Sequence, residues 1–130
     1  MDYKTLDAKL TGRCKHSRKL ANNTWAERRP PPRGADEFPD EIAIRLHNTD
    51  VLTFYADGRV RYDSGGWKTV TTKDRMNTYG LWPVYPERGR WYIRVKGHEY
   101  VYADGMTIGP RGGVTGAKRR VTASEPHDKV

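Results

Sequence analysis

Hydrophobic and polar residues alternate along several short stretches of the chain, with the period of two that is typical of β-strands with one buried face. Ile42, Ile44 and Leu46 occupy every second position of the first stretch. Residues 51–55 are β-branched and aromatic, and residues 59–62 alternate again. We therefore predict three short antiparallel strands in this region.

Turn signals separate these strands. Residues 47–50 (His-Asn-Thr-Asp) supply Asn and Asp, which tolerate tight turns and bond their own backbone. Residues 56–58 (Ala-Asp-Gly) place Gly after Asp, a strong hairpin signal. Short strands joined by such turns predict a β-meander.

The same plan recurs in the second half of the chain. Residues 55–58 (Tyr-Ala-Asp-Gly) reappear as residues 102–105. Three further pairs of segments match in the same order: Glu27-Arg28 with Glu87-Arg88, Ile44-Arg45-Leu46 with Ile93-Arg94-Val95, and Gly65-Gly66 with Gly112-Gly113. Ordered matches predict an internal repeat, with one meander in about 24–66 and another in about 84–113.

A helix is predicted between the two copies, over about 72–79, because threonines precede it as caps and Gly80 follows it. A second short helix is expected at 17–21. The predicted fold class is β-rich α+β, with two related antiparallel β-meander repeats bridged by a short central helix. We divide the chain into a basic N-terminal arm (1–23), a single β-rich domain (24–115) and a basic, polar C-terminal tail (116–130).

Composition limits the size of the core. Of the 130 residues 35% are hydrophobic and 11% are aromatic, so the chain is too aromatic for a disordered protein and too polar for a large core. No run of about 18 apolar residues is present, and the first residues lack the apolar stretch of a signal peptide. The single cysteine, Cys14, excludes an internal disulfide and a cysteine-rich zinc site. We expect a small, soluble protein that contacts no membrane.

Charge indicates the class of partner. The chain has 24 basic and 16 acidic residues, a net charge of +8. Residues 1–35 hold nine basic and three acidic residues, and residues 111–130 hold five and two, so the excess lies at the ends. Such a chain favours nucleic acid or another polyanion as partner. The alternative is that the charges only keep the protein soluble.

Strand periodicity also predicts which charged side chains face solvent. When the apolar residues of the strands face the core, the arginines between them point outward. We therefore expect a phosphate-binding face that consists of Arg45, Arg59, Arg61 and Arg94. The alternative is that these charges only protect surface strands against aggregation.

The segment from 65 to 75 combines two glycines, three threonines and three basic residues at the start of the predicted helix. A helix N-terminus with hydroxyls and lysines nearby suits an anion. We therefore add Trp67, Lys68, Lys73 and Arg75 to the nucleic-acid or phosphate site. The spacing is not that of a P-loop, so hydrolysis by that route is not predicted. The alternative is an ordinary cap and turn with surface lysines.

Candidate catalytic groups are few. His47 and Asp50 have the chemistry of a base and its orienting partner, but the pair fits a turn equally well. His47 and Asn48 are secondary candidates for the binding site. No spacing of His, Cys and carboxylates is typical of a metal site. We predict no enzyme, no metal site and no cofactor.

Several motifs resemble a family of small proteins of tailed bacteriophages that is common in phages of actinobacteria. They are the His-Asn-Thr-Asp-Val segment at 47–51, the Gly-Gly-Trp-Lys-Thr-Val-Thr-Thr-Lys segment at 65–73 with Asp-Arg-Met-Asn after it, and Val-Tyr-Ala-Asp-Gly at 101–105. Residues 23–29 and 87–92 fit the same pattern, so the likeness covers about 18–108. The resemblance implies a phage origin and the cytoplasm of a bacterial host, but no particular activity. The proline-rich insertion at 30–40 departs from the shorter turn of the family pattern.

From these observations we predict a non-enzymatic phage accessory protein that binds polyanions, above all nucleic acid, in the host cytoplasm. One alternative is an inhibitor of a host defence or regulatory protein, or a sequestrant of a nucleotide signal. Another is a hydrolase or nuclease that uses His47 and Asp50. A homo-oligomer is compatible with the repeat.

Overall fold

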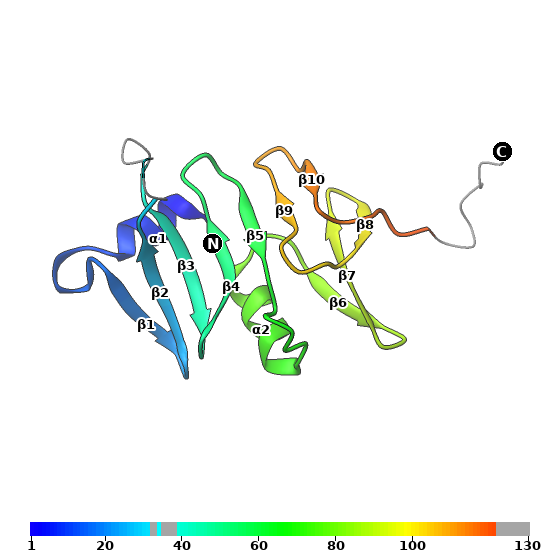
Figure 1. The fold of residues 1–130 in the computed structure, drawn as a ribbon, viewed down its shortest axis with the longest axis horizontal. Coiled ribbons are helices and arrows are strands. Elements are labelled where there is room, and N and C mark those ends of the chain that lie inside the picture. The colour runs from blue at the N-terminus through cyan, green and yellow to red at the C-terminus, as the bar shows by residue number, and fades with distance from the viewer. Residues whose placement is uncertain (32–33, 35–38, 122–130) are drawn as a thin grey trace.

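The computed structural model describes residues 1–31, 34 and 39–121, and these residues form two antiparallel β-sheets with helices against them (Figure 1). The expected β-rich α+β class is confirmed. The elements are α1 (Tyr3–Lys9), the 3-10 turn η1 (Gly12–Cys14), β1 (Ser17–Ala21), β2 (Thr24–Arg29), β3 (Glu41–Leu46), β4 (Thr49–Phe54), β5 (Val60–Tyr62), α2 (Val70–Tyr79), β6 (Val84–Glu87), β7 (Arg90–Val95), β8 (His98–Val101), β9 (Thr107–Ile108) and β10 (Val114–Thr115). Most of the proline-rich insertion lies outside the described residues.

The larger sheet has seven strands in the order β1-β2-β3-β4-β5-β9-β10. Its register places Ile42 opposite Phe54 and Ile44 opposite Leu52, and all four side chains are buried. Arg61 of β5 lies on the other face of the same sheet. The alternation in the sequence therefore produces one core face and one polar face, as predicted.

The N-terminal segment is part of the core and not an arm. The carboxylate of Asp2 caps α1 by accepting a hydrogen bond from the N–H of Thr5. Leu6 and Leu10 are buried in the same cluster as the large sheet, so two apolar side chains one turn apart dock this segment. The helix expected at 17–21 is wrong, because these residues form β1 and satisfy their backbone groups against β2.

The predicted central helix is confirmed as α2, although it begins at Val70 and its cap is Thr69. The Thr69 hydroxyl accepts a hydrogen bond from the N–H of Thr72, and Gly80 ends the helix with its N–H bonded to the carbonyl of Met76. Met76 is buried, and α2 packs against β3, β4 and β6. Neither helix in the described part of the chain is long and apolar enough to cross a membrane.

The smaller sheet consists of β6, β7 and β8, joined by two-residue turns. In both turns, Arg88-Gly89 and Lys96-Gly97, the two residues have left-handed backbones. This geometry matches the twist of the strands on either side. The turn expected at residues 96–97 is therefore confirmed.

The first part of the predicted C-terminal tail is docked on the edge of β8. The N–H of Val101 donates to the carbonyl of Lys118 at 2.8 Å, and the N–H of Arg120 donates to the carbonyl of Glu99 at 2.8 Å. Residues 118–120 therefore cover this edge as an added strand would, and the tail expected from residue 116 is corrected to that extent. Residues 122–130 lie outside the described residues.

The two copies of the predicted repeat differ in their last strand. In the first copy β2, β3, β4 and β5 lie side by side in the large sheet. In the second copy β9 is not part of the small sheet. It pairs instead with β5 of the large sheet, with Val60 opposite Ile108. The expectation that residues 106–108 complete a second meander is therefore wrong. Residues 118–120 occupy the edge of β8, and Tyr62 holds residues 105–106 through two backbone hydrogen bonds.

Candidate functional site

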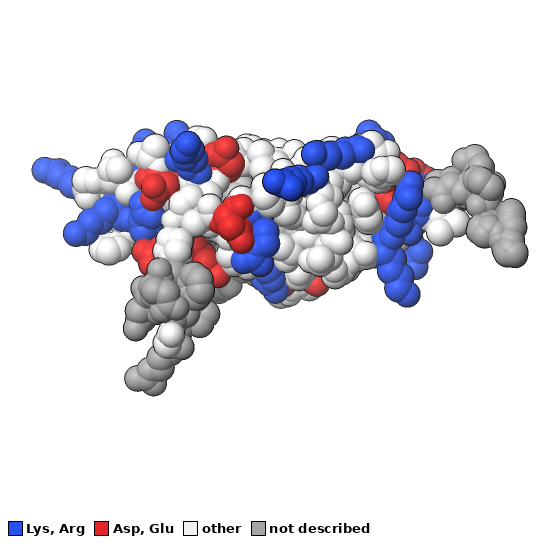
Figure 2. Space-filling model, turned by 90° about the horizontal axis from the view of Figure 1, so that it is seen from above, with Lys and Arg blue, Asp and Glu red and all other residues white. Residues whose placement is uncertain are grey.

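Each of the four strand arginines of the predicted phosphate-binding face is paired with a carboxylate. The pairs are Arg45 with Glu27, Arg59 with Asp57 and Arg61 with Asp63, each at 2.8 Å, and Arg94 with Glu99 at 3.2 Å. The hydrogen bond from Arg45 lowers the pKa of Glu27, so this pair stays charged at neutral pH. On the face seen in Figure 2, Lys and Arg side chains lie in separate groups, several of them beside acidic ones. The structure therefore does not contain the shared, unneutralised row of guanidinium groups that we expected.

A shallow groove on the polar face of the large sheet shows how this neutralisation is arranged. Arg29, Arg45 and Arg61 line the groove together with Asp50 and Asp63. Arg29 donates to both carboxylate oxygens of Asp50, at 2.8 and 3.2 Å. An incoming phosphate would have to displace a carboxylate and would meet the repulsion of the others. This groove is therefore a poor anion site.

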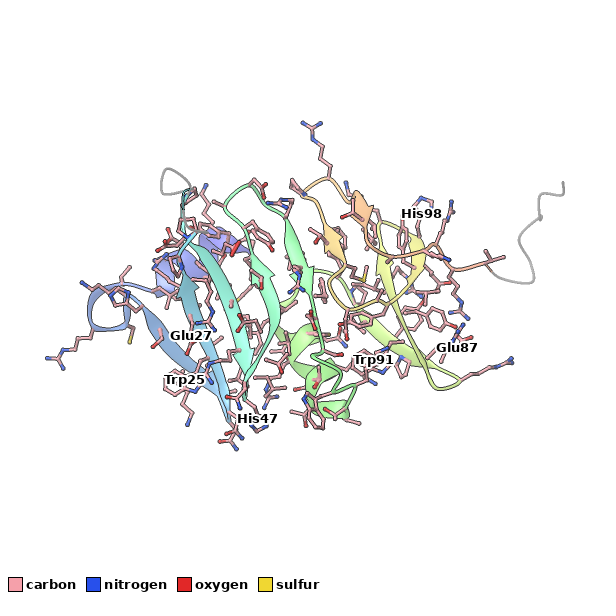
Figure 3. The ribbon with its side chains drawn as sticks, viewed as in Figure 1. Trp25, Glu27, His47, Glu87, Trp91 and His98 are labelled. Carbon is pink, nitrogen blue, oxygen red and sulfur yellow. The ribbon has the colours of Figure 1, made fainter. Side chains whose placement is uncertain are left out.

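A pocket of about 490 Å³ lies between the β3–β4 turn and the start of α2. Its lining residues are Leu46, His47, Asn48, Thr49, Val51, Ser64, Trp67, Thr69, Thr71 and Thr72. The structure thus brings His47, Asn48 and Trp67 of the predicted site together, and none of the lining residues is acidic. Figure 3 shows His47 at the turn that ends the β3–β4 hairpin.

A close approach of two segments shapes one wall of this pocket. Gly65 has a left-handed backbone, with φ of 63°, and the N–H of Gly65 donates to the Asp63 carboxylate at 2.7 Å. A Cβ at position 65 would lie 2.8 Å from side-chain atoms of Thr49. Any other residue there would therefore push the wall away from the β3–β4 turn.

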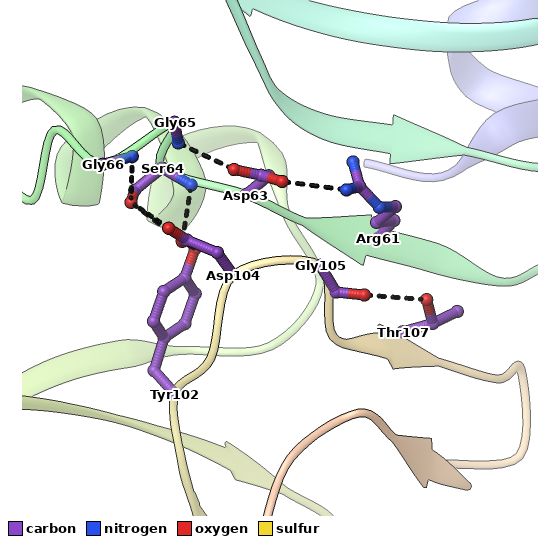
Figure 4. Close-up of polar contacts among 9 residues, drawn as sticks. All are labelled: Arg61, Asp63, Ser64, Gly65, Gly66, Tyr102, Asp104, Gly105 and Thr107. Atoms are coloured by element: carbon purple, nitrogen blue, oxygen red, sulfur yellow. Dashed lines mark hydrogen bonds and ion pairs between the residues drawn. The ribbon is translucent and has the colours of Figure 1, made fainter.

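Ser64 fastens the same wall to the second half of the chain (Figure 4). Its N–H donates to Asp104 at 2.8 Å, and its hydroxyl lies 2.8 and 2.9 Å from the two carboxylate oxygens. The Tyr102 hydroxyl donates to the same carboxylate at 2.8 Å. Burial alone would raise the pKa of Asp104, but the hydrogen bonds from Ser64 and Tyr102 outweigh it and the pKa is lowered. Asp104 is therefore an anion that holds the pocket wall in place.

Trp67 lines the pocket, and two lysines of the same segment lie over aromatic rings of the second half of the chain. Trp67 is 68% exposed. The ammonium of Lys68 lies 5.6 Å from the centre of the Tyr102 ring, and that of Lys73 lies 6.0 Å from the Trp91 ring. Ring faces attract cations without cancelling their charge, and neither lysine forms an ion pair with a described carboxylate. Both cations therefore lie near rings of the second half of the chain, and the charge of Lys68 also helps to lower the pKa of Asp104.

Arg75, the last residue of the predicted site, faces the interior of the fold. Its Nε donates to the hydroxyl of Thr24 at 2.8 Å, and its guanidinium pairs with Asp74 at 2.6 Å. These contacts tie α2 to β2. Arg75 therefore supports the site and does not extend its rim.

His47 and Asp50 do not form a hydrogen-bonded pair. The Asp50 carboxylate is bonded to Arg29. His47 occupies the β3–β4 turn with φ of 55°, and its ring forms no hydrogen bond with another described residue. Within the described ranges, no group of three His, Cys, Asp or Glu lies close enough to hold a metal ion. The geometry thus gives no orienting partner for a base at His47.

Sequence reasoning missed the residues that build the pocket wall. Thr49 belongs to the turn predicted at 47–50, and Ser64 follows the alternating stretch at 59–62. Asp104 was treated only as a turn residue. The repeated Tyr-Ala-Asp-Gly was the available signal, but a sequence does not reveal that one copy of a turn motif faces the core.

The fold and the pocket define a small β-rich protein with an acid-free pocket between a hairpin turn and a helix start. A family model described as Kyanoviridae Gp96 protein matches residues 13–109, which include every residue of the pocket and Asp104. The chain belongs to this family of phage proteins. The phage origin implied by the resemblance is confirmed, and the link to actinobacterial phages stays a prediction. A search of curated proteins and a search of solved structures found no match.

Proposed function

We propose that this phage protein binds single-stranded nucleic acid, without catalysing a reaction on it, at the rim of the pocket. The observation that carries the proposal is the exposed indole of Trp67 at an acid-free pocket, with Lys68 and Lys73 in the same segment of the chain. Bases of a single strand stack on exposed aromatic side chains, and the phosphates follow nearby cations. Lys68 and Lys73 are the cations assigned to that role.

A single strand fits this rim better than a duplex does. Bases in a duplex are already stacked on one another, so they gain little from one protruding indole. A base of a single strand is free to stack on Trp67. The paired arginines Arg45, Arg59, Arg61 and Arg94 have no part in this form of the proposal, because their charge is already compensated.

Further positive charge lies near the N-terminus. Six cations there form no ion pair with a described carboxylate: Lys4, Lys9, Arg13, Lys15, Arg18 and Lys19. Such charges attract a polyanion over a distance and make its binding depend on salt. We expect these charges to attract the nucleic acid over a distance and Trp67 to hold one of its bases by stacking.

Titration of labelled single-stranded and double-stranded DNA and RNA at about 50 mM and about 200 mM salt tests the proposal. We expect single strands to bind at the lower salt, more weakly at the higher salt, and in preference to duplexes. Trp67→Ala should weaken single-strand binding by roughly 5- to 150-fold, since stacking of one base contributes about 1–3 kcal/mol.

Val70→Ala is the matched control. Val70 is 78% exposed and close to Trp67 in the chain, but it does not line the pocket. Arg59→Gln is a second control, because it removes a cation that is already paired. Both variants should bind as the wild type does. The proposal is overturned if the wild type binds no single strand at the lower salt, or if Trp67→Ala binds unchanged.

A host protein is a second candidate partner. Trp67 and Val70 are both large, apolar and exposed at the start of α2, and adjacent exposed apolar side chains favour a protein interface. Such a partner would cover both side chains, so both substitutions should abolish its capture from nuclease-treated host lysate. Sensitivity to Trp67→Ala alone would instead favour nucleic acid.

A further inference from the structure

The outer edge of β8 is covered by residues 118–120, which we call the C-terminal segment. Tyr100 of β8 and Arg119 face each other as an antiparallel pair, with one backbone hydrogen bond on either side of them. The Arg119 side chain also contacts the ring of His98 at the exposed surface. A separate peptide adds a strand to a sheet edge in the same way. Residues 116–117 alone join the segment to β10, so it can leave β8 while β10 stays paired with β9.

Arg120 is the side chain that anchors the C-terminal segment. Its guanidinium lies 3.9 Å from the centre of the Tyr92 ring, pairs with Glu87 at 2.5 Å and lies 3.9 Å from the Glu99 carboxylate. Only 16% of the side chain is exposed, although it lies near the end of the chain. The segment is therefore held by two backbone hydrogen bonds and one enclosed arginine.

The socket around this guanidinium is built by the small sheet. Glu87 comes from β6, Tyr92 from β7 and Glu99 from β8. Glu99 is held without help from the C-terminal segment, because the Tyr85 hydroxyl and Arg94 both donate to its carboxylate. These hydrogen bonds lower the pKa of Glu99, so it stays charged at neutral pH. If the segment left, the sheet would still present a ring and two carboxylates at this edge.

We propose that the edge of β8 is a docking site for an extended peptide of a partner protein that carries an arginine, and that the C-terminal segment occupies this site in the free protein. Backbone hydrogen bonds to a sheet edge give such a peptide its affinity, and a side-chain pocket gives it specificity. A planar guanidinium stacks on a ring and fits carboxylates with two N–H groups, which the ammonium of lysine does not. The socket shares no residue with the pocket at Trp67, so the inference goes beyond the proposed function.

A second copy of this chain is a poorer occupant than a different protein. If two copies exchanged their C-terminal segments, each β8 would only regain the contacts that it had lost. The exchange would cost the freedom of two separate molecules. Each copy also has a net charge of +8, so two copies repel each other. A partner that is acidic outside its arginine-bearing peptide is attracted instead.

A labelled synthetic peptide with the sequence of residues 116–121, Gly-Ala-Lys-Arg-Arg-Val, is the probe, and fluorescence anisotropy measures its binding. The acceptor is the full chain with Arg120→Ala, in which the C-terminal segment has lost its anchor. We expect this variant to bind the probe at least about tenfold more tightly than the wild type does, because the tethered segment of the wild type competes at an effective concentration on the order of millimolar. A probe with lysine in place of its second arginine should bind at least about fivefold more weakly, although its charge is the same.

Two carboxylate substitutions in the Arg120→Ala background locate the site. Glu87→Gln should weaken binding of the probe, because it removes the charged partner of the guanidinium. Asp57→Asn is the matched control, since Asp57 is an exposed carboxylate of the large sheet that pairs with a different arginine. It should leave binding of the probe unchanged.

The inference is overturned if Arg120→Ala binds no probe, or if it binds the lysine probe equally well. If Arg120→Ala does not fold, both probes are added in excess to the wild type, where a preference for arginine supports the inference and equal binding opposes it. Analytical ultracentrifugation of the wild type tests the occupant. A dimer that the probe dissociates would show that the site takes a second copy, and would refute the assignment to a partner protein.

Discussion

Residues 55–58 and residues 102–105 have the same sequence, Tyr-Ala-Asp-Gly, but they form different contacts. In the first copy Asp57 accepts a hydrogen bond from the N–H of Arg59 at 3.0 Å and pairs with its guanidinium at 2.8 Å. That guanidinium lies 4.4 Å from the centre of the Tyr55 ring. All of these polar contacts lie within five residues of the chain, so the ion pair and the hydrogen bond of Asp57 are local.

The second copy forms long-range contacts. Tyr102 is buried and bonds Asp104, and Asp104 bonds Ser64, forty residues away. The N–H of Gly105 donates to the carbonyl of Tyr62 at 2.8 Å. This turn therefore joins the two halves of the chain and holds the wall of the pocket.

The residue that follows each turn explains the difference. Arg59 follows the first turn and supplies Asp57 with a cation at once. Met106 follows the second turn and is completely buried, so it brings the turn to the core and offers Asp104 no local partner. The buried hydroxyls of Ser64 and Tyr102 must be hydrogen-bonded, and the carboxylate of Asp104, itself exposed, meets that need. A turn motif therefore acquires its role from its neighbours.

The largest expected contrast between the two turns comes from removing the aspartates. Asp104→Ala leaves the donors of Ser64 and Tyr102 without an acceptor, so it should lower the free energy of unfolding by about 3 kcal/mol. Asp57→Ala removes an exposed pair and should change it by less than about 1 kcal/mol. Urea denaturation of the two variants measures both values. Equal losses of unfolding free energy in the two variants would contradict the different roles of Asp104 and Asp57.

The glycines of the two turns should show a smaller contrast in the opposite direction. Both have left-handed backbones, with φ of 98° at Gly58 and 86° at Gly105. A Cβ at Gly58 would lie 2.8 Å from Pro110, whereas one at Gly105 would first meet Arg61 at 3.5 Å. Gly58→Ala should therefore cost about 2 kcal/mol and Gly105→Ala about 1 kcal/mol. Thermal unfolding of the pair decides the order, and a greater loss at position 105 would refute it.

The smallest expected difference between the two aspartates is in how much stability each contributes as the pH falls. The N–H of Arg59 lowers the pKa of Asp57, and hydrogen bonds outweigh burial to lower the pKa of Asp104. Stability from a lowered carboxyl pKa is present above the unfolded value, about 3.9, and is lost as pH falls through the folded value. Asp104→Asn should therefore reduce the loss of stability between about pH 5 and about pH 2 more than Asp57→Asn does, because buried donors bond Asp104, whereas solvent weakens the exposed pair of Asp57. Urea denaturation across this range gives the slopes, and a greater reduction in Asp57→Asn would oppose the prediction.

Much of the fold was predictable because its signals are local. The alternation at 42–46, the Gly after Asp at 57–58 and the Thr and Gly around α2 each act within a few residues. The positions of β1 and β9 were not predictable in the same way. Both depend on which strand edge is free to accept a partner, and that is decided by distant parts of the chain.

Only part of the candidate site was predictable, because residue type is local and contacts across strands are not. His47, Asn48 and Trp67 stood out by residue type, and the pocket does bring them together. The four strand arginines also stood out, but strand periodicity gives only the face of a residue and not its neighbours across strands. Glu27 reaches Arg45 because β2 pairs with β3 in one particular register, and that register is a property of the folded sheet.

The pairing of β9 with β5 has a consequence for how the protein is made. The large sheet cannot be finished when β5 leaves the ribosome, because the strand that closes its edge is translated only after the whole small sheet. Until then β5 offers unpaired backbone groups to any passing chain. Two short strands, β9 and β10, thus replace β5 at the edge of the sheet only late in synthesis, and a product that stops after β8 would keep β5 as that edge.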